Sequence, residues 1–320
     1  MVPQDLHVIG ATTDGKLWHT IRFENPQAGL SWQPFGDVKV QTGDVGAFVD
    51  VDCAREMVEI SDPQGILHVV GVTSDGRLWY TARDPASKGW KQFRDGELSA
   101  GGPGPFLRAA ITTVPQGDRV EVVVAGVTAD GGLWATTRKP EGGFNPFARV
   151  APPPSSDRTC RAVALVAGPD ETATHLAAVS GDGHLWHAVG RTGQWPALQD
   201  VERSGAGGQP RDVTDVACAD DLDLVAVAGD GHVWHTTRGG TAWTLFTDPE
   251  ARKDVGTFTR VGVADIQSGL HICGVTGDGR LWHTLRIGSP EADARAVFGD
   301  VKAATHAPPA VGPFQAVACS

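Results

Sequence analysis

The chain has 320 residues, of which 41% are hydrophobic and 20% charged, so it can bury a large core as one domain or as two smaller ones. Asp and Glu outnumber Lys and Arg by 38 to 27, and the resulting net charge of −11 disfavours general binding to nucleic acid, because phosphates repel an acidic surface. The 41 glycines and 21 prolines are typical of many short strands joined by turns, and no apolar run approaches the ~20 residues that span a bilayer.

Short motifs that would mark export, metal binding or a common enzyme chemistry are missing from the sequence. Residues Met1 to Asp5 carry neither the basic nor the apolar segment of a secretory leader, although removal of a leader would leave the same sequence. The five cysteines show no CxxC or short-loop spacing, which predicts neither a disulfide framework nor a zinc knuckle. GxSxG, HExxH, P-loop and dinucleotide fingerprints do not occur, and the compartment stays open.

One segment recurs six times along the chain, about every 53 residues, and such a period indicates a repeat architecture. The first copy reads HVIGATTDGKLWHTIR and begins at His7. In every copy an apolar run leads into Asp-Gly and an alternating run follows, which predicts a β-hairpin with a tight turn and positive φ at its centre. The units are centred on Trp18, Trp79, Trp134, Trp186, Trp234 and Trp282.

Each unit continues with an aromatic segment and a short apolar run, which predict two further strands. The aromatic segments begin at Ser31, Gly89, Gly143, Gln194, Ala242 and Arg295. The apolar runs begin at Phe48, Phe106, Cys160, Val213, Phe258 and Phe314. Four strands per unit without helical periodicity predict an all-β, six-bladed β-propeller with four antiparallel strands per blade, as a single domain over residues 1–320. Two domains of three units are the alternative, but no linker separates the units.

The order of the strands predicts how the ring closes. The chain begins at the second strand of a unit, so residues 314–320 must supply the first strand of the first blade. Both termini would then close that blade and remove the exposed edge of an open array.

Eight of the eleven histidines fall in two columns of the repeat, and the columns allow two interpretations. A ring of histidines from different blades can hold a metal, whereas buried histidines can bond neighbours and fix one blade against the next. The second interpretation is favoured, because leucines flank the later column and Tyr80 and Ala135 replace histidine in it. We therefore predict no metal and no cofactor, and we expect the later column to be buried. The two columns are His7, His68, His175, His271 and His19, His187, His235, His283.

The third strand of each unit places its central Trp on the same face as a Thr and an Arg. A Trp ring can pack between blades, or it can stack on the C–H face of a sugar while Arg binds the hydroxyls, and the sequence leaves both open. The third unit lacks several of these residues, so we expect it not to bind a ligand. The predicted ligand-binding residues are Trp18, Arg22, Trp79, Arg83, Trp186, Trp234, Arg238, Trp282 and Arg286, while Trp32, Trp90, Trp195 and Trp243 share a fourth-strand column.

Acidic residues occur in two further sets. One set is equivalent in the fourth strands and predicts turn caps, or else acidic partners of a ligand: Asp37, Asp95, Asp200, Asp248 and Asp300. Charges on the innermost strands must pair across blades or face the axial channel, where they are candidates for a single active site: Asp50, Asp52, Arg108, Arg161, Asp215 and Arg260. Cys53, Cys218 and Cys319 alternate with Ile, Ala and Val in their column, which predicts small buried side chains.

The repeated pattern, an apolar run, TxDGxLWHT, a turn and then GW or SW, resembles the repeats of Photorhabdus-type bacterial propeller lectins and, more loosely, tectonin-type repeats. The resemblance covers nearly the whole chain and implies carbohydrate binding at or between the blades. This chain has six units where those lectins have seven, and its connecting segments are longer. The sialidase Asp-box does not fit, because here the glycine directly follows the aspartate.

These observations lead to one predicted function and two alternatives. We predict a non-catalytic, multivalent, lectin-like module that binds glycans or a small ligand, without nucleic acid or membrane insertion. The alternatives are an enzyme with one active site at the axial mouth and a scaffold that binds protein. The oligomeric state stays open.

Overall fold

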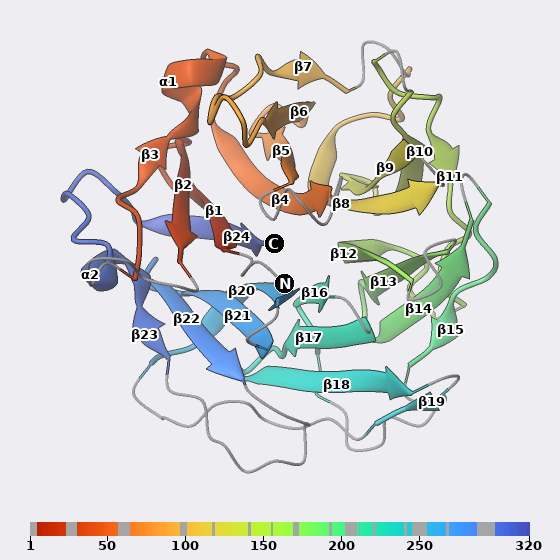
Figure 1. The fold of residues 1–320 in the computed structure, drawn as a ribbon. Coiled ribbons are helices and arrows are strands. Elements are labelled where there is room, and N and C mark those ends of the chain that lie inside the picture. The colour runs from red at the N-terminus through yellow and green to blue at the C-terminus, as the bar shows by residue number, and fades with distance from the viewer. Residues whose placement is uncertain are drawn as a thin grey trace.

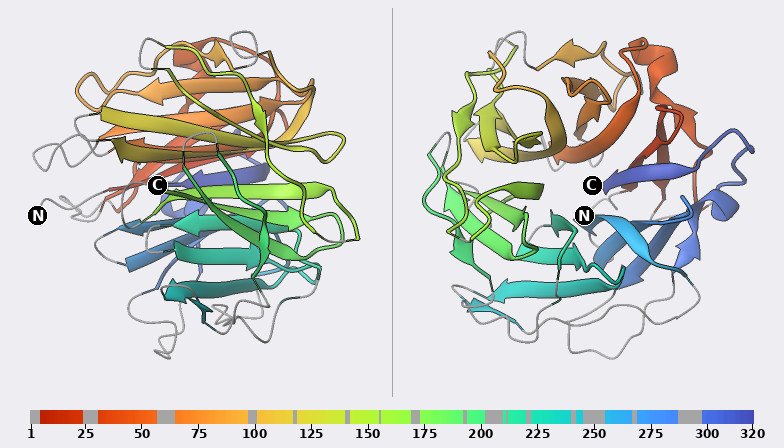
Figure 2. Two further views of the ribbon diagram at one scale, coloured as in Figure 1. Left: turned by 90° about the vertical axis from the view of Figure 1, so that its right-hand side faces the viewer. Right: turned by 180° about the vertical axis from the view of Figure 1, so that it is seen from behind.

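The computed structural model describes residues 5–320 except 24–30, 57–64, 97–100, 117–118, 140–141, 155, 169–172, 192–193, 202–209, 211, 220–221, 240–241, 245–254, 267–268 and 287–297. Six four-stranded antiparallel sheets stand around a central axis like the blades of a propeller (Figure 1). Figure 2 shows the same ring from the side and from behind. The predicted six-bladed propeller is therefore confirmed.

In each blade the strands follow one another from the axis to the rim. Blade 1 contains β24 (Phe314–Cys319), β1 (Leu6–Thr12), β2 (Leu17–Arg22) and β3 (Gly36–Asp37). Blade 2 contains β4 (Phe48–Glu56), β5 (Ile66–Thr73), β6 (Leu78–Arg83) and β7 (Arg94–Asp95). Blade 3 contains β8 (Phe106–Gln116), β9 (Arg119–Thr128), β10 (Leu133–Thr137) and β11 (Ala148–Arg149). Blade 4 contains β12 (Cys160–Ala167), β13 (Thr174–Ser180), β14 (Leu185–Gly190) and β15 (Gln199–Asp200).

The last two blades follow the same order. Blade 5 contains β16 (Asp215–Ala219), β17 (Asp223–Val227), β18 (Val233–Gly239) and β19 (Ala242–Trp243). Blade 6 contains β20 (Phe258–Ile266), β21 (Gly269–Thr276), β22 (Leu281–Arg286) and β23 (Gly299–Asp300). Two short helices, α1 (Val38–Thr42) and α2 (Val301–Ala304), follow the outermost strands β3 and β23.

The fourth-strand aspartates act as caps where the structure describes them at a helix. The Asp37 carboxylate accepts a hydrogen bond from the Lys39 N–H at 2.9 Å, and Asp300 accepts one from Ala303 N–H at 3.1 Å. Asp248 lies outside the described residues. In the described part of the chain, no helix is long and apolar enough to cross a membrane.

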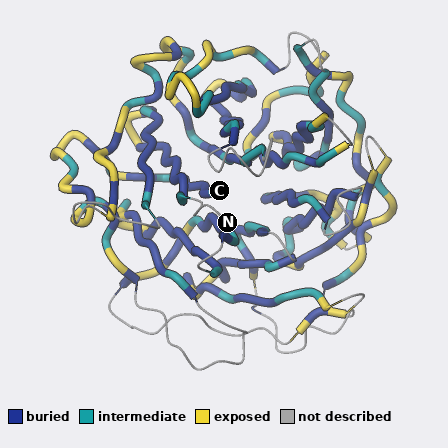
Figure 3. The backbone as a smooth tube through the Cα atoms, in the orientation of Figure 1, coloured by how far each residue is buried: buried dark blue, intermediate teal, exposed yellow. Residues whose placement is uncertain are grey.

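The apolar core lies between the blades. Each boundary between neighbouring blades holds one apolar cluster, such as the one that joins Ile9 and Leu17 of blade 1 to Phe48 and Val51 of blade 2. The second strands are covered on both sides, and all seven residues of β1 are buried. Figure 3 shows this as a buried interior with exposed segments at the rim.

Small residues on the second strands make room for aromatic rings of the first strands. Gly71 of β5 lies under the Phe48 ring, and a Cβ atom there would be 2.8 Å from the ring. The same close approach occurs in blades 1, 3 and 6, at Gly10–Phe314, Gly126–Phe106 and Gly274–Phe258. Blades 4 and 5 have Ala178 and Ala226 at this position, and there the residue equivalent to Phe is Cys160 at the start of β12 or Val213, two residues before β16.

We expect Gly71→Ala to lower the free energy of unfolding by about 1–3 kcal/mol, because the added methyl group collides with a packed ring. Chemical denaturation measures the loss. Adding Phe48→Val, which copies the pair found in blade 5, should restore part of it. An unchanged midpoint in Gly71→Ala would contradict the proposed contact.

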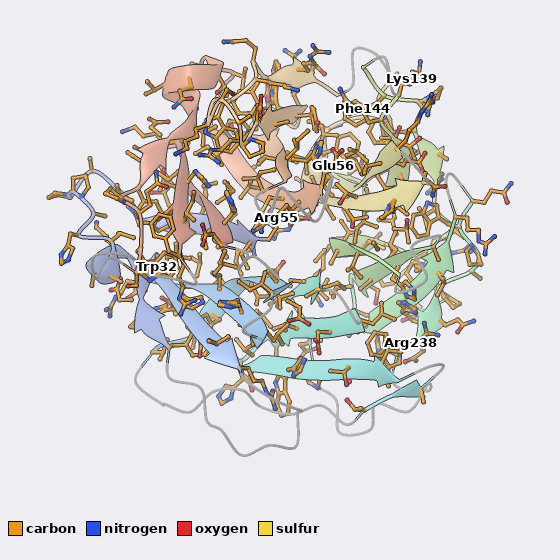
Figure 4. The ribbon with its side chains drawn as sticks, viewed as in Figure 1. Trp32, Arg55, Glu56, Lys139, Phe144 and Arg238 are labelled. Atoms are coloured by element: carbon orange, nitrogen blue, oxygen red, sulfur yellow. The ribbon has the colours of Figure 1, made fainter. Side chains whose placement is uncertain are left out.

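The ring closes through the two ends of the chain, as the strand order predicts. Strand β24 pairs with β1 from Val8–Cys319 to Thr12–Phe314. Arg55 of β4 donates hydrogen bonds to the carbonyls of Asp5 and Ser320, the latter at 2.8 Å, and Figure 4 labels it near the axis. The closing blade is thus tied to blade 2 as well.

The Asp-Gly hairpins form, but their turns differ from the expected tight turn. In the first hairpin, the Thr12 N–H donates to the Lys16 carbonyl at 3.0 Å, so the loop contains three residues. Of these three, Gly15 alone has a positive φ, 79°. The Asp14 carboxylate accepts a hydrogen bond from the Thr12 hydroxyl. This side-chain bond favours a type I turn that is followed by a left-handed glycine.

Candidate functional site

The third-strand tryptophans lie in the packed part of the blade boundaries. The Trp282 indole N–H donates to the Thr276 hydroxyl at 3.1 Å, and the Arg280 guanidinium lies 4.3 Å from the ring centroid. Arg280 is in turn bound to Asp300 at 2.8 Å. Trp18, Trp186 and Trp282 are buried, and Trp79, Trp134 and Trp234 are half-buried. Of the two interpretations that the sequence leaves open, this environment favours packing.

The Trp and the Arg of one third strand do not meet. Arg22 lies four positions after Trp18, which is about 13 Å along an extended strand. The Trp lies near the face of the ring that carries the Asp-Gly hairpins, which we call the hairpin face. Arg22 is opposite Leu6 in the strand pairing, at the other end of the blade, on what we call the terminus face. An aromatic partner for the Arg must therefore come from elsewhere.

The two histidine columns pair with each other within blades 1, 4 and 6. The distance between Nδ1 of His7 and Nε2 of His19 is 2.9 Å, and the pairs His175–His187 and His271–His283 have the same distance. In blade 2 His68 bonds the Tyr80 hydroxyl at 2.6 Å, and in blade 5 His235 bonds Asp223 at 2.6 Å. The predicted burial of the later column is confirmed, with exposed fractions of 9% or less at His19, His187, His235 and His283.

Each histidine pair faces an aromatic ring of the next blade. His19 lies edge-on to Trp90 at 5.4 Å between ring centroids, and His187 lies edge-on to Trp243 at 5.3 Å. At the closing boundary His283 meets Trp32 at 5.3 Å. These rings belong to the fourth-strand column of tryptophans.

The arginine column lies beside the same rings. Arg22, Arg83 and Arg238 are directly opposite Trp32, Trp90 and Trp243 in the strand pairing. A histidine pair of one blade and an Arg and a Trp of the next thus form one group, which we call the histidine–arginine–tryptophan cluster. It occurs at three boundaries: blades 1 and 2, blades 4 and 5, and blades 6 and 1 (Figure 4 labels Trp32 and Arg238).

The clusters carry positive charge on their arginines, whereas their histidines are neutral. Burial, assisted by Arg83, lowers the pKa of His19 from 6.5 to about 3. Burial likewise lowers the pKa of His187 to about 3, with His175 and Arg238 contributing. The imidazoles are therefore neutral at pH 7 and the guanidinium carries the charge. Burial also lowers the pKa of Arg83 and Arg238, and among the described residues neither has a carboxylate within ion-pair distance.

The other three boundaries differ from this arrangement. Between blades 2 and 3, Phe144 lies edge-on to Tyr80 and Arg138 lies 5.4 Å from the Tyr80 ring centroid. Between blades 5 and 6, Arg286 is 2.9 Å from Nδ1 of His235. Between blades 3 and 4 the positions hold Val123, Ala135 and Gly190, and a Cβ at Gly190 would lie 2.5 Å from Trp195. That boundary is apolar.

The charged residues on the innermost strands are largely engaged with the neighbouring blade. Asp50 pairs with Arg108 at 3.2 Å and also accepts from the Ala109 N–H at 2.9 Å. Asp52 accepts from Ile111 N–H at 2.8 Å, and Asp215 accepts from Val261 N–H at 2.9 Å. Pairing across blades, the first of the two readings of these residues, accounts for the three carboxylates and Arg108. Burial raises the pKa of Asp52 to about 7 and also raises that of Asp215.

The remaining channel side chains have local partners. Arg161 donates to the Ser180 carbonyl at 3.1 Å, and Arg260 donates to the Thr259 carbonyl at 2.7 Å. Cys53 and Cys319 are buried, and burial raises the pKa of both thiols, as expected of small apolar residues. Among the residues that the structure describes, no group of three or more His, Cys, Asp or Glu could hold a metal ion.

The clusters offer two kinds of contact to a ligand. A guanidinium supplies several N–H donors for hydroxyl oxygens, and an indole supplies a flat apolar surface. Sequence reasoning found the arginines but chose the third-strand Trp as their partner. The fourth-strand Trp column was visible in the sequence, but which blade face meets which neighbour was not.

Comparisons with known proteins give matches among solved structures alone. No protein-family model matches the chain, and neither does any curated protein sequence. The fucose-specific lectin from Aleuria aurantia is similar, with a TM-score of 0.64 and 11% identity over 94% of this chain and 92% of that one. AofleA from Arthrobotrys oligospora gives a TM-score of 0.63 and 10% identity over 94% and 87% of the two chains.

A third similar structure is the SapL1 lectin in complex with alpha methyl fucoside, with a TM-score of 0.60 and 14% identity over 92% of each chain. A further structure of the Aleuria lectin is described as a six-bladed β-propeller with a novel fucose recognition mode. At these identities the similarity concerns the fold. The chain therefore shares its six-bladed propeller fold with fucose-binding lectins.

Proposed function

We propose that the protein is a multivalent, non-catalytic lectin whose sugar sites are the histidine–arginine–tryptophan clusters. In each site the Arg donates hydrogen bonds to sugar hydroxyls. The sugar ring contacts the part of the fourth-strand Trp that packing leaves exposed, which is largest at the half-buried Trp90 and small at the buried Trp32 and Trp243. The arginines are Arg22, Arg83 and Arg238, with Arg286 in a variant site between blades 5 and 6. The third-strand tryptophans hold the blades together beneath these sites.

The observation that carries the proposal is the state of Arg83 and Arg238. Arg83 is buried and Arg238 is partly buried, and loss of water is costly for a charged group unless polar partners satisfy it. The Nε atom of Arg238 is buried without a hydrogen-bond partner among the described residues. Sugar hydroxyls satisfy such donors and place a pyranose against the adjacent ring.

The similar structures support a sugar of the fucose type. Their titles name fucose, alpha methyl fucoside or a fucose-containing disaccharide as ligand, and one title names a variant in which three arginines are replaced by alanine. The repeat motif TxDGxLWHT supports a finer kinship with Photorhabdus-type propeller lectins. We propose fucosylated glycans as the ligand class.

Calorimetric titration with methyl α-L-fucoside tests the proposal. We expect several weak sites, each with a Kd in the millimolar to micromolar range, because one stacked ring and a few hydrogen bonds give about 4–8 kcal/mol. Arg238→Gln should remove one site while the affinity of the others stays constant.

Arg191→Gln is the matched control, because Arg191 is an exposed residue at the end of the third strand of blade 4, beside the apolar boundary. It should leave stoichiometry and affinity unchanged. Equal losses in both variants, or a glycan array without any hit at high protein concentration, would contradict the lectin function. Thermal melts of both variants verify that the blades remain folded.

A further inference from the structure

A second site of different chemistry lies at the axial mouth on the hairpin face. Five of the six innermost strands carry a β-bulge at the same place, immediately after their first residue. A bulge re-aims the side chain of the extra residue. The bulged residues are Val49, Leu107, Arg161, Thr259 and Gln315.

An open hollow of about 590 Å³ occupies this mouth. Its walls come from five blades and include Val49, Leu107, Arg108, Arg161 and Arg260. The volume is in the range of small-molecule sites, about 300–1,000 Å³. A separate cavity of about 60 Å³ lies in the channel beside Asp50 and Asp215, with room for water molecules but not for a sugar.

The donors that face this hollow are incompletely used. Arg108 is paired with Asp50, but neither Arg161 nor Arg260 lies within ion-pair distance of a carboxylate among the described residues. The Nε atom of Arg260 is buried and has no hydrogen-bond partner there. Three arginines thus line one hollow, and Arg161 and Arg260 have donors left beyond these bonds.

The acidic groups nearby bond to backbone or hydroxyl groups, and two of them also interact electrostatically with the arginines, Asp215 with Arg260 and Asp157 with Arg161. Asp50 and Asp215 lie deeper and accept hydrogen bonds from backbone N–H groups. At the rim, Asp130 accepts from the Thr128 hydroxyl and the Gly132 N–H, and Asp157 accepts from Thr159. These carboxylates limit the net charge of the mouth, so recognition must come from the Arg donors.

The hollow also has an apolar wall. Leu107 is 53% exposed, one of few large hydrophobic side chains so exposed in the described residues, and Val49 lies beside it. An apolar wall next to guanidinium donors fits an organic anion better than an inorganic one. Arg presents paired N–H donors that match carboxylate geometry.

We propose that the axial mouth binds a small organic acid with a carboxylate, such as a sugar acid. The carboxylate is held by Arg161 and Arg260, and the carbon skeleton lies against Leu107. The site does not depend on the lectin clusters, since those lie at the blade boundaries near the terminus face.

Titration with sodium glucuronate at constant ionic strength tests this site, with glucose as the neutral probe and sodium sulfate as the inorganic one. Glucuronate should bind, and glucose and sulfate should bind at least 10-fold more weakly. Leu107→Glu should weaken glucuronate binding at least 10-fold, whereas Leu107→Gln, which differs only in charge, should change it by less than 3-fold. Both changes fall on an exposed side chain, so folding is preserved.

Arg161→Gln should weaken glucuronate binding at least 10-fold, and Arg158→Gln, at an exposed neighbour outside the hollow, should have no effect. Arg238→Gln should also leave glucuronate binding intact, which separates this site from the lectin clusters. Absence of glucuronate binding in the unaltered protein, equal binding of sulfate, or equal losses in the Leu107 pair would overturn the proposal.

Discussion

Deletion of residues 314–320 is expected to abolish cooperative folding. The deletion removes β24, the innermost strand of blade 1, and with it Phe314, Val317 and Cys319 of the apolar cluster at the closing boundary. It also exposes the edge of β1 and leaves Arg55 without the Ser320 carbonyl. Burying side chains of this size contributes about 1.5–3 kcal/mol each, so their loss is comparable with the whole stability of a typical domain, about 5–15 kcal/mol.

Calorimetry or circular dichroism during heating measures this effect. The full chain should show one cooperative transition and the truncated chain none, or one at far lower temperature. Replacing Ser320 by Ala is the control, since it keeps the backbone carbonyl that Arg55 uses. An unchanged transition after truncation would mean that the ring does not depend on β24.

Mild acid is expected to destabilise the protein strongly, at pH values at which exposed carboxylates such as Asp14 and Asp44 are still ionised. The pKa of five paired histidines is lowered by burial in the folded state, to about 3 for His19, His187 and His271 and well below 6.5 for His7 and His283. Between pH 6.5 and about 3 the unfolded chain therefore binds protons that the folded chain excludes. Stability is full above pH 6.5 and falls as the pH falls.

The size of the loss follows from the number of groups. Each such histidine lowers the free energy of unfolding by up to about 1.4 kcal/mol per pH unit. Asp52 and Asp215 act in the opposite direction, because burial raises the pKa of both carboxyls, that of Asp52 to about 7, and the folded state holds protons that the unfolded state releases. Five groups outweigh this opposing contribution, and we expect a net loss of about 5 kcal/mol or more between pH 7 and pH 5.

Denaturant titrations at a series of pH values measure the loss. The double variant His175→Val/His187→Ala copies the residues that blade 3 has at these positions, Val123 and Ala135. It should weaken the pH dependence by about one fifth, because His187 is one of the five histidines whose pKa is lowered by burial. A free energy of unfolding that stays flat from pH 7 to pH 5 would show that the histidines are not held neutral.

The architecture was predictable because each unit repeats the same local signals. Alternating runs, Asp-Gly turns and a regular period specify strands and their order, and the starting phase of the chain specifies its closure. The turn geometry was not predictable in the same way, because the Asp14 side chain selects a three-residue loop through its bond to Thr12. The bulges of the innermost strands were not predicted either; each inserts one extra residue and bends its strand.

For the candidate site, the sequence predicted the residue types but not which of them lie together. The columns of His, Arg and Trp could be read from the repeat, and so could the unusual third unit. Their combination depends on which face of one blade meets the next, a long-range contact without a local signal. His283 of blade 6, for example, lies against Trp32 of blade 1, which is opposite Arg22 in the strand pairing. The unusual third unit gives an apolar boundary with blade 4, where Gly190 faces Trp195.

The number of sugars bound per chain tests the central proposal most directly. Native mass spectrometry of the full chain, titrated with methyl α-L-fucoside, resolves each bound ligand as a separate mass. The three histidine–arginine–tryptophan clusters predict at least three bound ligands at saturation, and one fewer in Arg238→Gln. No bound sugar, or a single sugar that persists in Arg238→Gln, Arg83→Gln and Arg22→Gln alike, would contradict a multivalent lectin with sites between its blades.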